Sequence, residues 1–182
     1  MKLYLVRHAA AIARSQKTAE ENRYLTIRGR KYFRLTAQRM AKKKEMPDVI
    51  VTSPLARALQ TAEILSEALD FQGEVVVSPE LAPGLDVAGL RRIIASFKGS
   101  RGLALVGHEP DTGEVTGELL KLAQPFSLKK GMIVCLKMGS GKQKGKASLK
   151  WILFEGKKIK SSTLGIEEIQ TEPEGQEKQP ST

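Results

Sequence analysis

The stretch KLYLVRHAA, residues 2–10, joins a short apolar run to a polar pair. Lys2–Val6 is rich in strand-forming residues and stops abruptly at Arg7-His8. The same pattern returns in LALVGHEP, residues 103–110, where the apolar run is closed by Gly107-His108. An uninterrupted apolar run of this length is typical of a strand that is buried on both faces of a parallel sheet.

Amphipathic stretches between the apolar runs predict helices. Thr26 is expected to cap a helix that runs to about Lys43, because a threonine side chain can accept a hydrogen bond from the first turn. Apolar residues at helical spacing predict the buried face of this helix: Ile27, Tyr32, Phe33, Leu35 and Met40. Three further helices are expected. One follows Ser53-Pro54, with Ser53 as its cap, one runs to about Phe97 with Asp86 as its cap, and one follows Pro110.

Two more apolar runs, residues 48–52 and 74–78, predict strands between these helices. Residues 132–138 and 148–154 flank a turn rich in glycine and lysine and predict a hairpin. This alternation predicts the α/β class: a three-layer α/β/α sandwich whose central sheet is mostly parallel, with the C-terminal hairpin at its edge. We expect one domain over residues 1–160.

The composition restricts the chemistry that the chain can carry. Its 182 residues include one cysteine and two histidines, too few for a disulfide framework, a cysteine-rich zinc site or a histidine metal centre. No apolar run approaches the roughly 18 residues that cross a membrane, and the N-terminus lacks the layout of a signal peptide. We therefore expect a cytoplasmic protein with no cofactor and no metal, no membrane association, and a monomeric state.

The formal charge of +10 is unevenly distributed. Residues 129–160 contain ten lysines and one acid, whereas residues 165–182 contain five glutamates and one lysine. The second segment has the composition of a disordered acidic tail. The lysine-rich segment has only Trp151 and Phe154 as aromatic company, so it does not predict a stacking surface for nucleic acid. It fits the docking of an acidic partner better than specific nucleic-acid binding.

Basic and imidazole groups gather at one edge of the predicted sheet. Ligands of open α/β sheets bind outside the carboxyl ends of the strands, and three of these ends carry such groups. One strand ends in Arg7-His8, another ends in Gly107-His108, and a third leads through Ser53-Pro54 to a helix with Arg57 in its first turn. A single histidine at a strand end is usually structural, but this convergence predicts a site for a phosphate-like dianion.

The mixture of side chains suggests how such a dianion would react. Arginine offers phosphate oxygens a planar fork and stays charged at neutral pH. A neutral imidazole can attack phosphorus, and water can hydrolyse the resulting phosphohistidine in a second step. This route needs no metal.

Three motifs in order resemble the histidine phosphatase superfamily, also called the phosphoglycerate mutase-like family. They are LVRHAA at 5–10, TSPLARALQTAEIL at 52–65 and VGHEP at 106–110. Arg23-Tyr24-Leu25-Thr26 followed by Gly29, and the stretch PELAP at 79–83, make the chain similar to the SixA-type phosphohistidine phosphatases. The resemblance runs from residue 1 to about 154.

The resemblance implies a role for each matching residue. His8 would be the nucleophile that is transiently phosphorylated, and Arg7 and Arg57 would bind the phosphoryl oxygens. His108 would contact the same group and stabilise its charge in the transition state. Arg23 would be a further phosphate-binding arginine, which nothing in its local sequence reveals.

The general acid that larger family members use has no secure counterpart here, and Glu80, Asp86 and Glu109 remain candidates. Because imidazole leaves far more readily than an alkoxide, a phosphohistidine needs less help from an acid than a phosphoester. The resemblance therefore implies a phosphorylated protein as substrate, such as a histidine-containing phosphotransfer domain. A small-molecule phosphomonoesterase and a phosphate- or polyanion-binding module without turnover remain alternatives.

Overall fold

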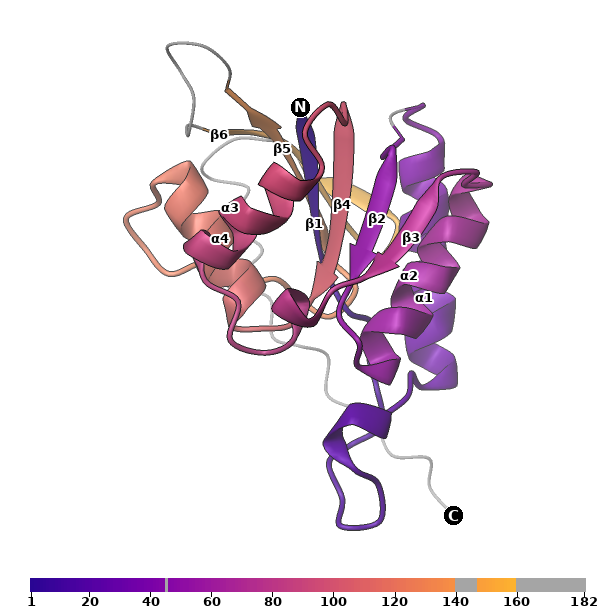
Figure 1. The fold of residues 1–182 in the computed structure, drawn as a ribbon. Helices are drawn as coiled ribbons and strands as arrows, with labels where there is room; N and C mark the ends of the chain where they lie inside the picture. Colours follow the sequence, from indigo (N-terminus) through magenta and orange to yellow (C-terminus); the bar gives the residue numbers. More distant parts are fainter. Residues whose placement is uncertain (45, 140–146, 160–182) are drawn as a thin grey trace.

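In the computed structural model, residues 1–44, 46–139 and 147–159 are described. These residues form four helices and seven strands, which alternate from α1 to β5 and end in three consecutive strands (Figure 1). The strands are β1 (Lys2–Arg7), β2 (Val49–Thr52), β3 (Glu74–Val77), β4 (Gly102–Gly107), β5 (Ile133–Met138), β6 (Ala147–Phe154) and β7 (Lys157–Ile159). The helices are α1 (Ile27–Ala41), α2 (Ala56–Leu69), α3 (Val87–Ser96) and α4 (Asp111–Leu120), with short 3-10 turns at Glu20–Asn22 (η1) and Pro79–Leu81 (η2). The acidic tail expected at 165–182 lies outside the described residues.

The strands form one sheet in the order β3-β2-β4-β1-β5-β6-β7. The first four strands in this order are parallel, and β5, β6 and β7 continue the sheet antiparallel to their neighbours. The predicted hairpin is therefore confirmed as β5 and β6, but β7 was not expected. It is a short edge strand of which two of three residues are lysine, so it carries no apolar pattern.

Two hydrophobic cores lie on opposite faces of the sheet, as the predicted sandwich requires. Helices α1 and α2 cover one face, and α3 and α4 cover the other (Figure 1). Leu3 and Leu5 point into the core under α3 and α4, while Tyr4 and Val6 point into the core under α1 and α2. Because both faces of β1 are buried, its sequence is uniformly apolar instead of alternating. Cys135 and Trp151 are core residues too.

The expected buried face of α1 is partly wrong. Ile27 is 88% exposed, and Tyr32 and Leu35 are also exposed. The buried residues are Gly29, Phe33, Thr36, Ala37 and Met40. The cause is a close approach at Gly29, where a Cβ atom would lie 2.1 Å from the carbonyl oxygen of Ala10. Because Gly29 packs against Ala10, α1 turns its Gly29 side toward the chain that follows β1. Several of its larger apolar residues therefore face solvent.

The helix caps at Thr26 and Asp86 are confirmed, since each side chain accepts a hydrogen bond from the N–H group three residues later. The cap expected at Ser53 is wrong. Helix α2 begins at Ala56 after Leu55. The Ser53 hydroxyl accepts from Leu55 N–H, before the first turn of the helix, and contacts His108. Among the described residues, no helix is both long enough and apolar enough to cross a membrane.

Candidate active site

The site lies where β1, β4 and β2 end side by side. The parallel register pairs Arg7 with Gly107 across β1 and β4. The next residue continues this pairing, because His8 N–H donates to the Gly107 carbonyl at 3.0 Å. On the other side of β4, Ser53 N–H donates to the Val106 carbonyl at 3.0 Å. The backbone of the sheet therefore fixes where His8, Ser53 and His108 leave it.

His8 has a defined tautomer. Its Nδ1 lies 2.7 Å from the carbonyl oxygen of Ala9, and a carbonyl can only accept, so Nδ1 carries the proton. The other ring nitrogen, Nε2, accepts from Arg57 Nε at 3.3 Å. The lone pair of Nε2 therefore faces the arginine. A neutral imidazole with this lone pair is a nucleophile aimed at the place where an anion would bind.

Both histidines are neutral at physiological pH. Burial, helped by the charges of Arg57 and Arg7, lowers the pKa of His8 to about 3, although the hydrogen bond to Ala9 opposes this shift. Burial also lowers the pKa of His108 to about 4, with Arg57 as the second cause. The two ring centroids are 5.2 Å apart. Two neutral rings can lie close to each other and to the guanidinium groups of Arg57 and Arg7, whereas two imidazolium ions would be repelled.

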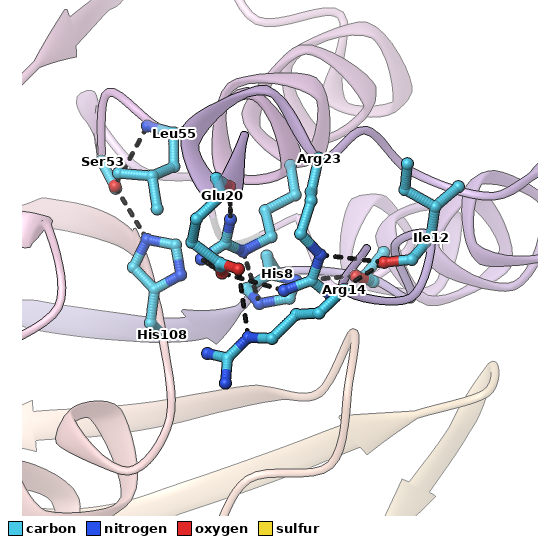
Figure 2. A network of polar contacts seen from close by, with 10 residues as sticks. His8, Ile12, Arg14, Glu20, Arg23, Ser53, Leu55 and His108 are labelled. Carbon is cyan, nitrogen blue, oxygen red and sulfur yellow. Dashed lines mark hydrogen bonds and ion pairs between the residues drawn. The ribbon is translucent and has the colours of Figure 1, made fainter. Parts of the chain in front are cut away.

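A serine sets the tautomer of His108. The Ser53 hydroxyl oxygen accepts from Leu55 N–H at 3.3 Å and lies 2.8 Å from His108 Nε2 (Figure 2). The hydroxyl keeps its own proton and a second lone pair, so it can either donate to Nε2 of His108 or accept from it. We assign it as the donor, because Nδ1 then carries a proton that an oxyanion in the site can accept. The proton of the ring then sits on Nδ1, which is buried and has no partner among the described residues. His108 is thus ready to donate to an oxyanion.

This assignment predicts that Ser53→Ala slows turnover more than it weakens substrate binding. Loss of a hydrogen bond that fixes the His108 tautomer corresponds to about 1 kcal/mol, so we expect kcat to fall about fivefold to tenfold with little change in KM. Steady-state kinetics measure both. Ser96→Ala on α3 is the control, because that hydroxyl is exposed and bonds only to Arg92. Equal kinetics for the two variants would contradict the assignment.

Arg57 is buried in the first turn of α2, with 5% of its side chain exposed. Besides Nε, which donates to His8, its Nη1 donates to the backbone carbonyl of Glu20 at 2.8 Å. Its Nη2 lies 3.1 Å from the Glu20 carboxylate. Thr61, one turn further along α2, donates to the Arg57 carbonyl and accepts from Ala9 N–H. Helix α2 therefore holds both the guanidinium and the segment that follows His8.

Arg23 reaches this group through Glu20. Its Nη1 donates to Glu20 Oε1 at 2.8 Å, while Nε and Nη2 donate to the carbonyl of Ile12. Arg14 donates to the other carboxylate oxygen of Glu20 at 3.0 Å (Figure 2). Neither Glu20 nor Arg14 is predicted from the sequence. They lie between predicted elements, and the only available signal was an acid three residues before Arg23.

Arg7 lies on another side of the site. Its Nη1 donates to the carbonyl of Leu128 at 2.6 Å. Its positive charge helps to lower the pKa of both histidines, so the Arg7 guanidinium belongs to the same site as the two rings. The structure thus brings His8, His108, Arg57 and Arg23 together, with Arg7 held by the 125–131 loop.

The three candidate acids have different surroundings. Glu80 is exposed and pairs with Arg92 at 2.9 Å, and Asp86 caps α3. Glu109 is half-buried, and the loss of hydration raises its pKa to about 7. Its Oε2 accepts from Ser127, and its Oε1 has no partner among the described residues. Of the three, Glu109 is the carboxyl group that can hold a proton near neutral pH.

These pKa values predict how stability depends on pH. Unfolded histidines gain a proton below about pH 6.5, but folded His8 and His108 stay neutral to about pH 3 and 4. Protonation therefore favours unfolding, by about 2 kcal/mol per histidine between pH 6.5 and about pH 5. Glu109 acts oppositely, because its folded pKa of about 7 exceeds the ordinary 4.5. It offsets about 2 kcal/mol of the loss over the same window.

Between about pH 6.5 and about pH 5, we therefore expect the free energy of unfolding of the parent to fall by about 2 kcal/mol. In Glu109→Gln we expect it to fall by about twice as much. Urea titrations at the two pH values measure both differences. The exposed Glu114 of α4 supplies the control variant Glu114→Gln, which should behave like the parent. A smaller loss in Glu109→Gln than in the parent would contradict the sign given to Glu109.

Within the described part of the chain, no group of three or more histidine, cysteine, aspartate or glutamate side chains is arranged to hold a metal ion. The fold and the site together define an α/β protein in which imidazole and guanidinium groups surround a position suited to a phosphate-like anion. The chain belongs to the histidine phosphatase superfamily (branch 1), whose family model matches residues 3–83. Membership in this superfamily supports a phosphatase activity for the chain.

Two sequence relatives extend this assignment. An uncharacterized protein of Picosynechococcus is 36% identical over 151 residues, which cover 78% of this chain and 88% of the relative. The phosphohistidine phosphatase SixA of Escherichia coli is 27% identical over 121 residues, which cover 65% of this chain and 74% of SixA. Within the superfamily, the chain therefore resembles the SixA-type members, as its motifs predict.

Solved structures share the fold. The protein histidine phosphatase SixA complexed with tungstate has a TM-score of 0.76 at 24% identity, covering 85% of this chain and 97% of that one. A protein described as an alpha-ribazole-5'-P phosphatase from Escherichia coli has a TM-score of 0.62 at 18% identity, covering 86% and 97%. At these identities the likeness concerns the fold. The same fold thus occurs in proteins named for different substrates.

Proposed function

We propose that this chain is a metal-independent phosphatase that removes the phosphoryl group from phosphohistidine on a protein, through a phospho-His8 intermediate. The observation that carries the proposal is the state of His8. Its ring is neutral, its Nδ1–H donates a hydrogen bond to the carbonyl oxygen of Ala9, and its Nε2 lone pair faces Arg57. A buried imidazole held in this way has one unprotonated nitrogen, which can attack phosphorus when the Arg57 donor turns from this lone pair to the phosphoryl oxygens.

In the first step, the Nε2 lone pair of His8 would form a bond to phosphorus while the bond from phosphorus to the substrate nitrogen breaks. The electron pair of the broken bond stays on the substrate imidazole, which takes up a proton. The proton on Nδ1 of His8 stays in place, so the phosphorylated ring is cationic, and the Ala9 carbonyl stabilises it. The Nδ1 proton of His108 and the guanidinium of Arg57 would bind the phosphoryl oxygens as charge shifts onto them.

In the second step, water would attack phosphorus and break the bond to His8 Nε2. The electron pair returns to Nε2, the water gives up a proton, and inorganic phosphate leaves. The depressed pKa of His8 favours this return, because burial disfavours the cationic ring. Two displacements at phosphorus, with His8 Nε2 first as nucleophile and then as leaving group, thus replace one direct attack of water on the substrate.

The substrate class follows from the leaving group. Imidazole departs without the strong acid that an alkoxide requires, and neither Glu80 nor Asp86 is free to serve as one. The resemblance to SixA-type members, one of which is named a phosphohistidine phosphatase, supports the same class. A histidine-containing phosphotransfer domain is a protein that presents such a group. Exposed Lys130 in the 125–131 loop could contact acidic residues of such a partner.

The proposal is tested by a side-by-side assay. A phosphotransfer domain carrying phosphohistidine, free phosphoramidate and a panel of phosphoesters are offered to the full chain, with and without a chelator. We expect phosphate release to be fastest from the phosphorylated protein and unchanged by the chelator. Faster release from an ester would contradict the substrate class, and loss of activity with chelator would contradict the metal-free route.

One observation favours a second candidate, a small-molecule phosphomonoesterase. Burial gives Glu109 a pKa of about 7, so it can carry a proton that an alkoxide leaving group would need. Glu109 follows His108 directly, but its oxygens face Ser127 and the start of α4. In the same assay, ester hydrolysis that Glu109→Gln abolishes would favour this candidate. Binding of phosphate without any turnover would indicate a binding module.

A further inference from the structure

A carboxylate of the chain itself occupies the centre of the guanidinium cluster. Oε1 of Glu20 lies 2.8 Å from Arg23 Nη1 and 3.1 Å from Arg57 Nη2, and its Oε2 lies 3.0 Å from Arg14 Nε (Figure 2). Three guanidinium groups therefore converge on one negative charge. Although partial burial raises the pKa of Glu20, the hydrogen bond and charge of Arg23 and the charge of Arg57 keep it below its ordinary value. The carboxylate is ionised.

This contact uses the groups that a phosphoryl group needs. All three guanidinium nitrogens of Arg57 are engaged: Nε with His8, Nη1 with the Glu20 carbonyl and Nη2 with the Glu20 carboxylate. The one nitrogen of Arg23 that does not donate to Ile12 also bonds to Glu20. An oxyanion that approaches His8 Nε2 therefore competes with the Glu20 carboxylate for these two arginines, because both already pair with its negative charge.

We propose that Glu20 is a specificity-determining residue: its carboxylate competes with free oxyanions for Arg57 and Arg23, and so selects for phosphoryl groups on a protein. This rests on the proposed function. A small anion such as inorganic phosphate must displace Glu20 with its own charge alone. A phosphorylated protein makes further contacts outside the pocket, and these offset the cost of displacement. The same competition would hasten release of the phosphate product.

The surroundings of Glu20 allow this exchange. It lies in the 3-10 turn η1, whose residues are not buried, and 41% of its side chain is exposed. Arg14, its partner through Oε2, is 80% exposed. A carboxylate that leaves Arg57 can therefore turn outward and keep its ion pair with Arg14. Arg57 stays in place, because its Nε and Nη1 contacts do not depend on the carboxylate.

Calorimetric titration of inorganic phosphate into the full chain tests the proposal without any substrate. Glu20→Gln keeps the size of the side chain and removes its charge, and Glu20→Ala removes the side chain. We expect both variants to bind phosphate about tenfold more tightly than the parent. Glu21→Gln is the matched control, because Glu21 is the exposed neighbour in the same turn, and it should leave the affinity unchanged.

The kinetic counterpart compares kcat/KM for the phosphorylated protein with kcat/KM for free phosphoramidate. We expect Glu20→Gln to lower this ratio about tenfold, chiefly by improving the small substrate. Unchanged or weaker phosphate binding in both Glu20 variants would overturn the proposal, since the carboxylate would then only position the arginines. The phosphate titration remains decisive even where no phosphohistidine is hydrolysed, so the two proposals fail separately.

Discussion

Replacing His8 by alanine is expected to eliminate the phosphoenzyme and to reduce phosphate release by about 10⁴-fold or more. Loss of a nucleophile that acts together with its partners typically costs 10⁴ to 10⁶ in turnover, and binding groups alone supply the remainder. The only other histidine, His108, cannot replace it. Its Nε2 lies against the Ser53 hydroxyl, and its Nδ1 is the nitrogen we assign as protonated. Neither nitrogen offers a free lone pair.

The measurement is labelling with a phosphate-radiolabelled substrate, stopped in alkaline denaturant because phosphoramidates hydrolyse in acid. The parent should retain label on the protein during turnover, and His8→Ala should retain none. His108→Asn serves as the comparison, because it keeps the nucleophile and loses only a group that binds the phosphoryl oxygens. Slow labelling of His108→Asn is therefore expected. Label that persists on His8→Ala would contradict the intermediate.

The sequence predicted the parts of the fold that depend on short-range pattern. The strand ends at His8 and His108 followed from apolar runs buried on both faces, and the caps at Thr26 and Asp86 followed from local hydrogen bonding. These features need only the residues within one element. They were sufficient to place both histidines at one edge of the sheet.

Features that depend on contacts between elements were missed. The buried face of α1 is set by the approach of Gly29 to Ala10, which no periodicity within the helix reveals. Ser53 was assigned to the cap of α2 because serine before proline is a common helix start, but its hydroxyl is used by His108, 55 residues away. A contact between distant parts of the chain therefore determines the role of the Ser53 hydroxyl, and α2 begins without it.

Glu20 shows why the charge pattern of the site could not be predicted. The motifs identified cations and imidazoles, which suggested a strongly positive pocket with room for an anion. The structure places an acid from the 12–25 loop among three arginines, so the local charge is partly neutralised before any ligand binds. That loop has little regular structure beyond the turn η1, and hence no spacing from which its side chains could be placed.

The Arg57→Lys variant is expected to lower kcat/KM by about 10²- to 10³-fold while preserving the positive charge. Arg57 joins three groups at once: His8 through Nε, and the carbonyl and carboxylate of Glu20 through Nη1 and Nη2. Lysine is a point charge and cannot hold this planar arrangement. The His8 ring would then lose the donor that aligns its Nε2, and loss of one oriented donor in an active site commonly costs a factor of this size.

The division between kcat and KM identifies the cause. A lysine ammonium still attracts phosphate, so KM should change several-fold, whereas misalignment of His8 Nε2 should appear mainly in kcat. Arg92→Lys on α3 is the control, since Arg92 is an exposed arginine that also pairs with a glutamate. If Arg57→Lys were as active as Arg92→Lys, charge alone would account for the role of Arg57. A loss confined to kcat would instead assign to Arg57 the alignment of the nucleophile, which is a function that only its planar fork can perform.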